Sequence, residues 1–128
     1  MLLLAVLHFL PEADGPAAIV ATLARALAPG SYLAISHLTA DFAPDQVGAA
    51  VQAYNAAVPG GVTPRGHAEV TALFGGLPLV PPGVVPVTEW RPEIPAGPAA
   101  PAADLYAGIA RTPPHACAST TRLGVLIG

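Results

Sequence analysis

The stretch that decides the fold is the apolar run Leu2-Leu3-Leu4-Ala5-Val6-Leu7-His8-Phe9-Leu10-Pro11. An uninterrupted apolar run of this length is typical of a β-strand that is buried on both faces, as inner strands of parallel sheets are. Such a strand needs neighbours on both sides, and the residues that follow can supply one flank only. We therefore expect the 128 residues to form the second half of an α/β domain whose N-terminal half is missing, either as a fragment or because the start is misplaced.

Two other interpretations of this run fit less well. A secretory signal has a basic residue ahead of its apolar core, and the first basic residue here is Arg25. A transmembrane helix needs about 20 apolar residues. Pro11, Glu12 and Asp14 end the run well before that length.

The composition excludes several classes of function. The chain is 53% hydrophobic and 10% charged, so it can bury a core. It contains 5 arginines, no lysine and 8 acidic residues, for a net charge of -3. This balance provides no basic surface for nucleic acid or for an anionic membrane. The single cysteine, Cys117, favours a reducing, cytoplasmic setting.

A βαβ unit is predicted in the first third of the chain. Asp14-Gly15-Pro16 offers a helix start, and apolar residues then recur at helical spacing until Pro29-Gly30, which predicts a helix over 16–28. Residues 31–38 form a second apolar run of strand length. Strand, helix and strand in this order favour two adjacent parallel strands with a right-handed crossover.

The rest of the chain is expected to be less regular. Helices are predicted over 44–58 and from the pair Thr63-Pro64 to Gly75-Gly76. The segment 77–91 has strand character, although its prolines restrict it to edges or bulges, and it should pair in a hairpin-like manner with a last strand over 105–110. Residues 92–103 are expected to be a loop. The tail 112–128 shows neither helical nor alternating periodicity. It stays unassigned, with disorder as one interpretation.

Three groups of residues resemble a known family: Leu7-His8-Phe9-Leu10-Pro11, the helix from Ile19 that continues into Pro29-Gly30-Ser31-Tyr32-Leu33-Ala34-Ile35-Ser36-His37, and Trp90-Arg91-Pro92. In this order they are similar to the C-terminal half of a bacterial family of S-adenosylmethionine-dependent methyltransferases, formerly catalogued as a domain of unknown function. The resemblance covers about residues 1–111. It implies the fourth to seventh strands of the three-layer, Rossmann-like class I methyltransferase sheet.

The resemblance also implies function. It implies S-adenosylmethionine as cofactor and a small-molecule methyl acceptor. In the family, a Gly-rich turn and an acidic residue that hold the cofactor lie upstream of the matched part, and no Gly-x-Gly occurs in these 128 residues. We therefore expect the chain alone to bind cofactor weakly or not at all, and to self-associate through an exposed sheet edge. The alternative is a non-catalytic binding or regulatory remnant that docks on a partner.

Candidate site residues follow the two predicted parallel strands. Ligands of open α/β sheets bind beyond the carboxyl ends of the strands, so we expect His8 and Phe9 to line the cofactor's side of the pocket. His37 is the candidate catalytic base for an acceptor that must lose a proton. Ser36 and Asp41 are expected on the substrate's side of the same crevice.

Other interpretations of these residues remain. His8 also fits a structural histidine, and Asp41 also fits a cap of the following helix. A hydrolase triad is disfavoured because Ala34 and Leu38 occupy the glycine positions of the G-x-S-x-G elbow. No metal site is expected, since the two histidines on separate strands lack compact ligand spacing.

Overall fold

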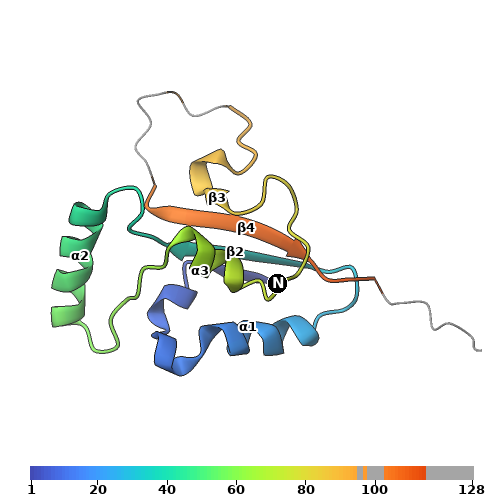
Figure 1. The fold of residues 1–128 in the computed structure, drawn as a ribbon, viewed down its shortest axis with the longest axis horizontal. Coiled ribbons are helices and arrows are strands. Elements are labelled where there is room, and N and C mark those ends of the chain that lie inside the picture. Colours follow the sequence, from blue (N-terminus) through green and yellow to red (C-terminus); the bar gives the residue numbers. More distant parts are fainter. Residues whose placement is uncertain (95–96, 98–102, 115–128) are drawn as a thin grey trace, which may run out of the picture.

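The computed structural model describes residues 1–94, 97 and 103–114. Strands and helices alternate along the first half, and short 3-10 turns link several of them (Figure 1). The elements are β1 (Leu2–Leu4), η1 (Leu7–Phe9), η2 (Glu12–Asp14), α1 (Pro16–Arg25), β2 (Tyr32–Leu38), α2 (Pro44–Ala57), α3 (His67–Ala72), β3 (Val85–Pro86), η3 (Val87–Glu89) and β4 (Leu105–Arg111).

The strands form one mixed sheet in the order β1-β2-β4-β3. β1 and β2 are parallel, with Leu3 opposite Ile35, and α1 connects them. β4 runs antiparallel to β2 along its whole length, and β3 pairs antiparallel with β4. The predicted βαβ unit and the hairpin-like pairing of the last two strands are therefore confirmed, as is the partial Rossmann-like α/β class.

The core lies on one face of this sheet. Leu33 and Ile35 of β2 point to this face, together with Tyr106 and Ala110 of β4, because side chains alternate along a strand. α1 and α3 cover the same face and contribute buried apolar side chains to it. The buried apolar residues of this cluster are Leu7, Val20, Leu33, Ile35, Val70, Leu73, Phe74, Val84, Tyr106 and Ala110.

The opposite face is only partly covered. Ala34 and Ile109 lie there beneath Val80 and Trp90, whereas Leu2 at the edge is 71% exposed, and Leu4 is exposed as well. The prediction that the first strand is buried on both faces is therefore wrong for this structure. Of the three predicted layers, the described residues form the sheet and one helical layer. Self-association through the β1 edge stays a prediction.

β1 is shorter than the apolar run that predicted it. Ala5 adopts a left-handed backbone conformation, with φ of 51°, which takes the chain out of the extended strand geometry. Its N–H donates to the carbonyl oxygen of Ser36 (3.1 Å) and to the Ser36 hydroxyl (3.0 Å). Leu7–Phe9 then forms the 3-10 turn η1, so His8 lies on a turn beyond the strand.

α3 begins later than predicted. Thr63-Pro64 does not cap it; the helix starts at His67, after Gly66, whose N–H donates to the carboxylate of Glu69 at 2.8 Å. The segment 77–91 is mostly irregular, as its prolines indicate, and pairs with β4 only through β3 and one bridge at Leu79.

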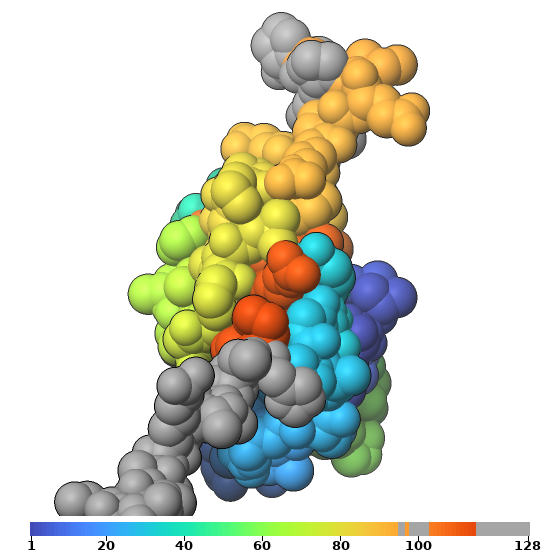
Figure 2. Space-filling model, turned by 90° about the vertical axis from the view of Figure 1, so that its right-hand side faces the viewer, coloured from blue at the N-terminus to red at the C-terminus, as the bar shows by residue number. Residues whose placement is uncertain are grey.

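The first residue of the predicted tail packs against the fold. The N–H of Thr112 donates to the carbonyl of Ser31 at 2.8 Å. Figure 2 views this end of the sheet, where the last residues of β4 lie beside the residues that precede β2. Residues 115–128 and most of the predicted loop 92–103 lie outside the described residues. Among the helices that the structure describes, none combines the length and apolarity that a membrane span requires.

The tight contact of β4 with the helical layer gives a test of this packing. A Cβ at Gly108 would lie 3.0 Å from Val84 Cγ2 and 3.1 Å from Phe74 Cζ, both buried. We expect Gly108→Ala to lower the free energy of unfolding in urea by about 1–3 kcal/mol, because both neighbours are packed in the core. The matched control is Gly48→Ala in α2. Apart from its chain neighbours and the local backbone of α2, none of the described residues comes within 4 Å of the added Cβ there, and the change should stabilise by roughly 0.5–1 kcal/mol. Equal effects of both changes would contradict the packing.

Candidate active site

Residues 62–66 cross the carboxyl ends of β1 and β2, and we call them the crossing segment. The N–H of Thr63 donates to the carbonyl of His8 at 2.7 Å, and the N–H of Arg65 donates to the carbonyl of Leu38 at 3.0 Å. The segment thus joins the turn after β1 to the last residue of β2.

The end of α2 is tied to the same segment. The side-chain amide of Asn55 donates to the carbonyl of Val62 at 3.0 Å and accepts from its N–H at 2.7 Å. In Figure 1, α2 stands at the end of the sheet where β2 ends. The paired bonds of Asn55 therefore hold α2 beside the carboxyl ends of the parallel strands.

A buried guanidinium lies beneath the crossing segment. Arg65 is 3% exposed, and it donates to the carbonyls of Leu7 (3.3 Å) and Leu10 (2.9 Å). It also donates to His37 Nε2 at 3.0 Å and reaches the carboxylate of Glu12 at 3.3 Å. Because Glu12 is 80% exposed, this ion pair contributes little. Backbone carbonyls and the imidazole are the main partners of the cation.

His37 is fully buried, and both of its ring nitrogens have partners. Arginine has no acceptor, so His37 Nε2 must accept from Arg65, and Nδ1–H donates to its neighbour's carbonyl, that of Leu38, at 2.7 Å. Burial lowers the pKa of His37 to about 4, the hydrogen bond to Leu38 opposes this, and the charge of Arg65 adds to it. At neutral pH the ring is therefore uncharged, with its basic nitrogen facing a cation.

His8 and Phe9 lie together on η1. Their rings are 4.5 Å apart, and the ring of His8 packs edge-on against His37 with 5.7 Å between centroids. His8 is 8% exposed, and its Nδ1 is buried without a hydrogen-bond partner among the described residues. Burial, and then the charge of Arg65, lowers the pKa of His8 below 6.5. His8 therefore carries a buried ring nitrogen that has no partner among the described residues.

Asp41 hydrogen-bonds to the first residue of α3 and does not cap α2, the helix that follows it in sequence. Its carboxylate accepts the N–H of His67 at 3.1 Å and the hydroxyl of Tyr106 at 2.9 Å. Burial, and then the bond to Asp41, raises the pKa of Tyr106, so the hydroxyl remains a donor. Asp41 therefore links the start of α3 to β4, and the interpretation of it as a cap of 44–58 is wrong.

The structure does not bring Ser36 to His37. Side chains of neighbouring residues on β2 point to opposite faces, and the hydroxyl of Ser36 accepts the N–H of Ala5 at 3.0 Å. In register, Ser36 lies between Leu4 and Ala107, on the face away from the helices.

A cavity of about 550 Å³ opens at this end of the sheet, between η1 and α2. We call it the α2 cavity. Its lining residues come from η1, the end of β2, one face of α2, the crossing segment and the residue before β4: His8, Phe9, Leu38, Gln46, Val47, Ala50, Val51, Tyr54, Val62 and Asp104.

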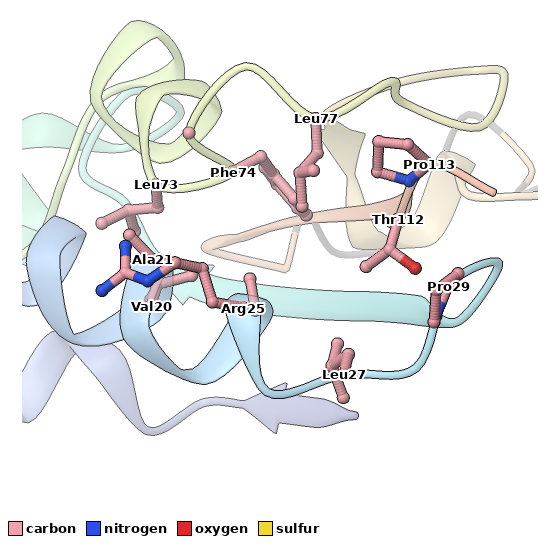
Figure 3. Close-up of a pocket in the computed structure, with 12 residues that line it drawn as sticks. Val20, Ala21, Arg25, Leu27, Pro29, Leu73, Phe74, Leu77, Thr112 and Pro113 are labelled. Carbon is pink, nitrogen blue, oxygen red and sulfur yellow. The ribbon is translucent and has the colours of Figure 1, made fainter. Parts of the chain in front are cut away.

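A second hollow, of about 360 Å³, lies at the other end of the parallel strands. Figure 3 shows Val20 and Arg25 of α1, and Leu73 and Phe74 after α3, around it. Thr112, which bonds to the residue before β2, completes this end. Ligands of open α/β sheets bind at the carboxyl ends, so the α2 cavity is the better candidate site.

The family model of S-adenosyl methyltransferases matches residues 1–113. The chain belongs to this family. The predicted family is thereby confirmed, and it implies S-adenosylmethionine as cofactor.

Two solved structures are similar to this member of the S-adenosyl methyltransferase family. One is a DUF574 family protein from Streptomyces avermitilis, with 38% identity and a TM-score of 0.81. The other is a protein from Thermobifida fusca assigned as a methyltransferase, with 30% identity and a TM-score of 0.75. Each comparison covers 88% of this chain and 43% of the other, so the chain spans less than half the length of either. No curated protein matches it.

The site contains one important residue that the sequence analysis missed. Arg65 joins His37 to the turn that carries His8, and the only signal for it was its rarity, as one of 5 arginines in a chain without lysine. Among the described residues, no three His, Cys, Asp or Glu side chains cluster as metal ligands would. The roles predicted for His8, Phe9, Ser36, His37 and Asp41 stay predictions. The contacts of His37 favour positioning over proton transfer.

The buried state of His37 has a consequence for stability. Unfolded, the imidazole binds a proton below about pH 6.5, whereas the folded chain binds it only near pH 4. The unfolded state therefore binds more protons across this window, and the free energy of unfolding should fall by ~3 kcal/mol as pH drops from 6.5 to 4. Urea unfolding across this pH range measures the fall. His37→Gln should show a smaller one. An NMR titration placing the pKa of His37 near 6.5 would contradict the arrangement.

Proposed function

We propose that this chain is part of an enzyme that transfers a methyl group from S-adenosylmethionine to a small-molecule acceptor. The observation that carries the proposal is the match to the S-adenosyl methyltransferase family over residues 1–113. The position of the α2 cavity at the carboxyl ends of β1 and β2 supports it, because cofactors and substrates of open α/β sheets bind there.

The residues at the end of β1 suit one side of the cofactor. Phe9 presents an exposed ring, and the ring of His8 packs against it. An exposed aromatic face can pack against a flat part of a ligand. We propose that His8 and Phe9 lie beside the bound cofactor.

His37 and Arg65 act in this proposal as positioning residues. S-adenosylmethionine, when bound, supplies a methyl group whose bonding pair stays with sulfur while a lone pair of the acceptor forms the new bond. Such a displacement depends mainly on alignment of the two groups. Arg65 donates both to the carbonyl of Leu7 in η1 and to His37, so the pair fixes the place of His8. An acceptor hydroxyl releases its proton to water.

The 128 residues by themselves should hold the cofactor poorly. They span 43% of the similar solved chains and contain no Gly-x-Gly turn for the methionine part. Only one side of the site, at His8 and Phe9, is then available. We expect millimolar or weaker affinity, with contacts confined to η1.

Nitrogen-15 NMR of the labelled chain during a titration with S-adenosylmethionine tests both the weak affinity and the place of the cofactor at η1. The expected result is a weak, saturable shift of the His8 and Phe9 amides, with none at Thr112 at the other end of the sheet. Phe9→Ala should reduce these shifts. The matched control, Phe42→Ala, removes a ring of similar exposure that does not line the α2 cavity and should leave them unchanged.

Two results would count against the proposal. Micromolar affinity would refute the expectation that these residues hold only one side of the cofactor. Shifts centred on residues away from η1 would refute the site.

A further inference from the structure

The α2 cavity has a size and a lining that define a class of ligand. Its volume of about 550 Å³ lies within the range of roughly 300–1,000 Å³ that is usual for small-molecule sites. Seven of its ten lining residues are aliphatic or aromatic. Val47, Ala50, Val51 and Tyr54 present one continuous face of α2, since they are spaced three and four apart.

Two aromatic rings lie on separate walls of the cavity. Phe9 comes from η1 and Tyr54 from α2, and both keep an exposed part. Aromatic side chains pack well against flat apolar rings. The lining therefore favours a ligand with an aromatic or similarly flat apolar body.

The polar groups of the cavity are few and lack a cation. His8, Gln46 and Asp104 are its polar lining residues. Asp104 would repel an anionic ligand, and no Arg or Lys lines the cavity in the described part of the chain to offset this. A fully ionised ligand would also lose hydration against the apolar walls.

The imidazole of His8 supplies the hydrogen bond that such a ligand needs. His8 is 8% exposed, and its Nδ1 has no partner among the described residues. A buried polar atom without a partner is unusual in folded proteins. His8 also lines the α2 cavity, so a hydroxyl on the ligand can hydrogen-bond to its imidazole.

We propose that the α2 cavity binds the methyl acceptor, an uncharged, aromatic-sized small molecule whose hydroxyl hydrogen-bonds to the imidazole of His8. The identification of this ligand as the acceptor rests on the proposed function; the existence of the site and its ligand class do not.

Three matched probes test the ligand class on the 128-residue chain: 2-naphthol, naphthalene and 2-naphthoate. They share one flat body and differ in a hydroxyl, a hydrogen and a carboxylate. NMR titrations should show saturable shifts of η1 and of the cavity face of α2 with 2-naphthol. Naphthalene should bind about fivefold more weakly, for one lost hydrogen bond. 2-Naphthoate should bind weakest of the three.

Paired variants locate the binding. Ala50→Trp fills the cavity and should weaken 2-naphthol at least tenfold, whereas Ala49→Trp, on the same helix but outside the lining, should leave it within twofold. His8→Phe keeps the ring and removes the nitrogen. It should abolish the preference for 2-naphthol over naphthalene while binding of naphthalene persists.

The outcomes separate this inference from the proposed function. Binding of 2-naphthol as described, with S-adenosylmethionine shifts centred away from η1, would sustain the cavity and overturn the proposed place of the cofactor. Shifts by S-adenosylmethionine at η1 without binding of 2-naphthol would overturn the cavity as a ligand site. Equal losses in both tryptophan variants, preference for 2-naphthoate, or shifts on the exposed face of β1 would also overturn the inference.

Discussion

One buried cation organises the end of the sheet where the candidate site lies. The guanidinium of Arg65 spans the carbonyls of Leu7 and Leu10 and the ring of His37, which belong to two different elements. Removing it would leave the buried Nε2 of His37 without its donor, at a cost of about 1–3 kcal/mol, whereas the carbonyl of Leu7 would keep the N–H of Leu10. Its ion pair with exposed Glu12 is a minor contribution by comparison. Local order at the ends of β1 and β2 therefore depends on hydrogen bonds to a charge and not on an ion pair.

This constraint connects the fold to the proposed chemistry. With Nδ1–H bonded to a carbonyl and Nε2 facing Arg65, His37 has both nitrogens engaged, whereas neighbouring His8 keeps Nδ1 without a partner among the described residues. Methyl transfer from a sulfonium depends on alignment more than on proton transfer. A rigid support beneath His8 suits that requirement. The apolar face of α2, held in place by Asn55, forms another wall of the α2 cavity.

The sequence predicted what depends on periodicity and missed what depends on single long-range contacts. The βαβ unit followed from two apolar runs with a helical face between them, because burial of one face imposes those periods. The early end of β1 depends on the backbone of Ala5, which no apolar pattern reveals. His37 was expected to be a base from its place at a strand end, but burial lowers its pKa and its Nε2 accepts a hydrogen bond from Arg65, 28 residues away. Asp41 likewise accepts hydrogen bonds from His67 of α3 and Tyr106 of β4, which are both distant in sequence.

The central claim is that Arg65 donates to Nε2 of a neutral His37 and so holds the turn after β1. Long-range proton–nitrogen NMR of the imidazoles at neutral pH tests it most directly, since it identifies which ring nitrogen carries the proton. The account predicts that His37 is protonated at Nδ1 and bare at Nε2. A proton on Nε2, in either the other neutral tautomer or the imidazolium, would contradict it.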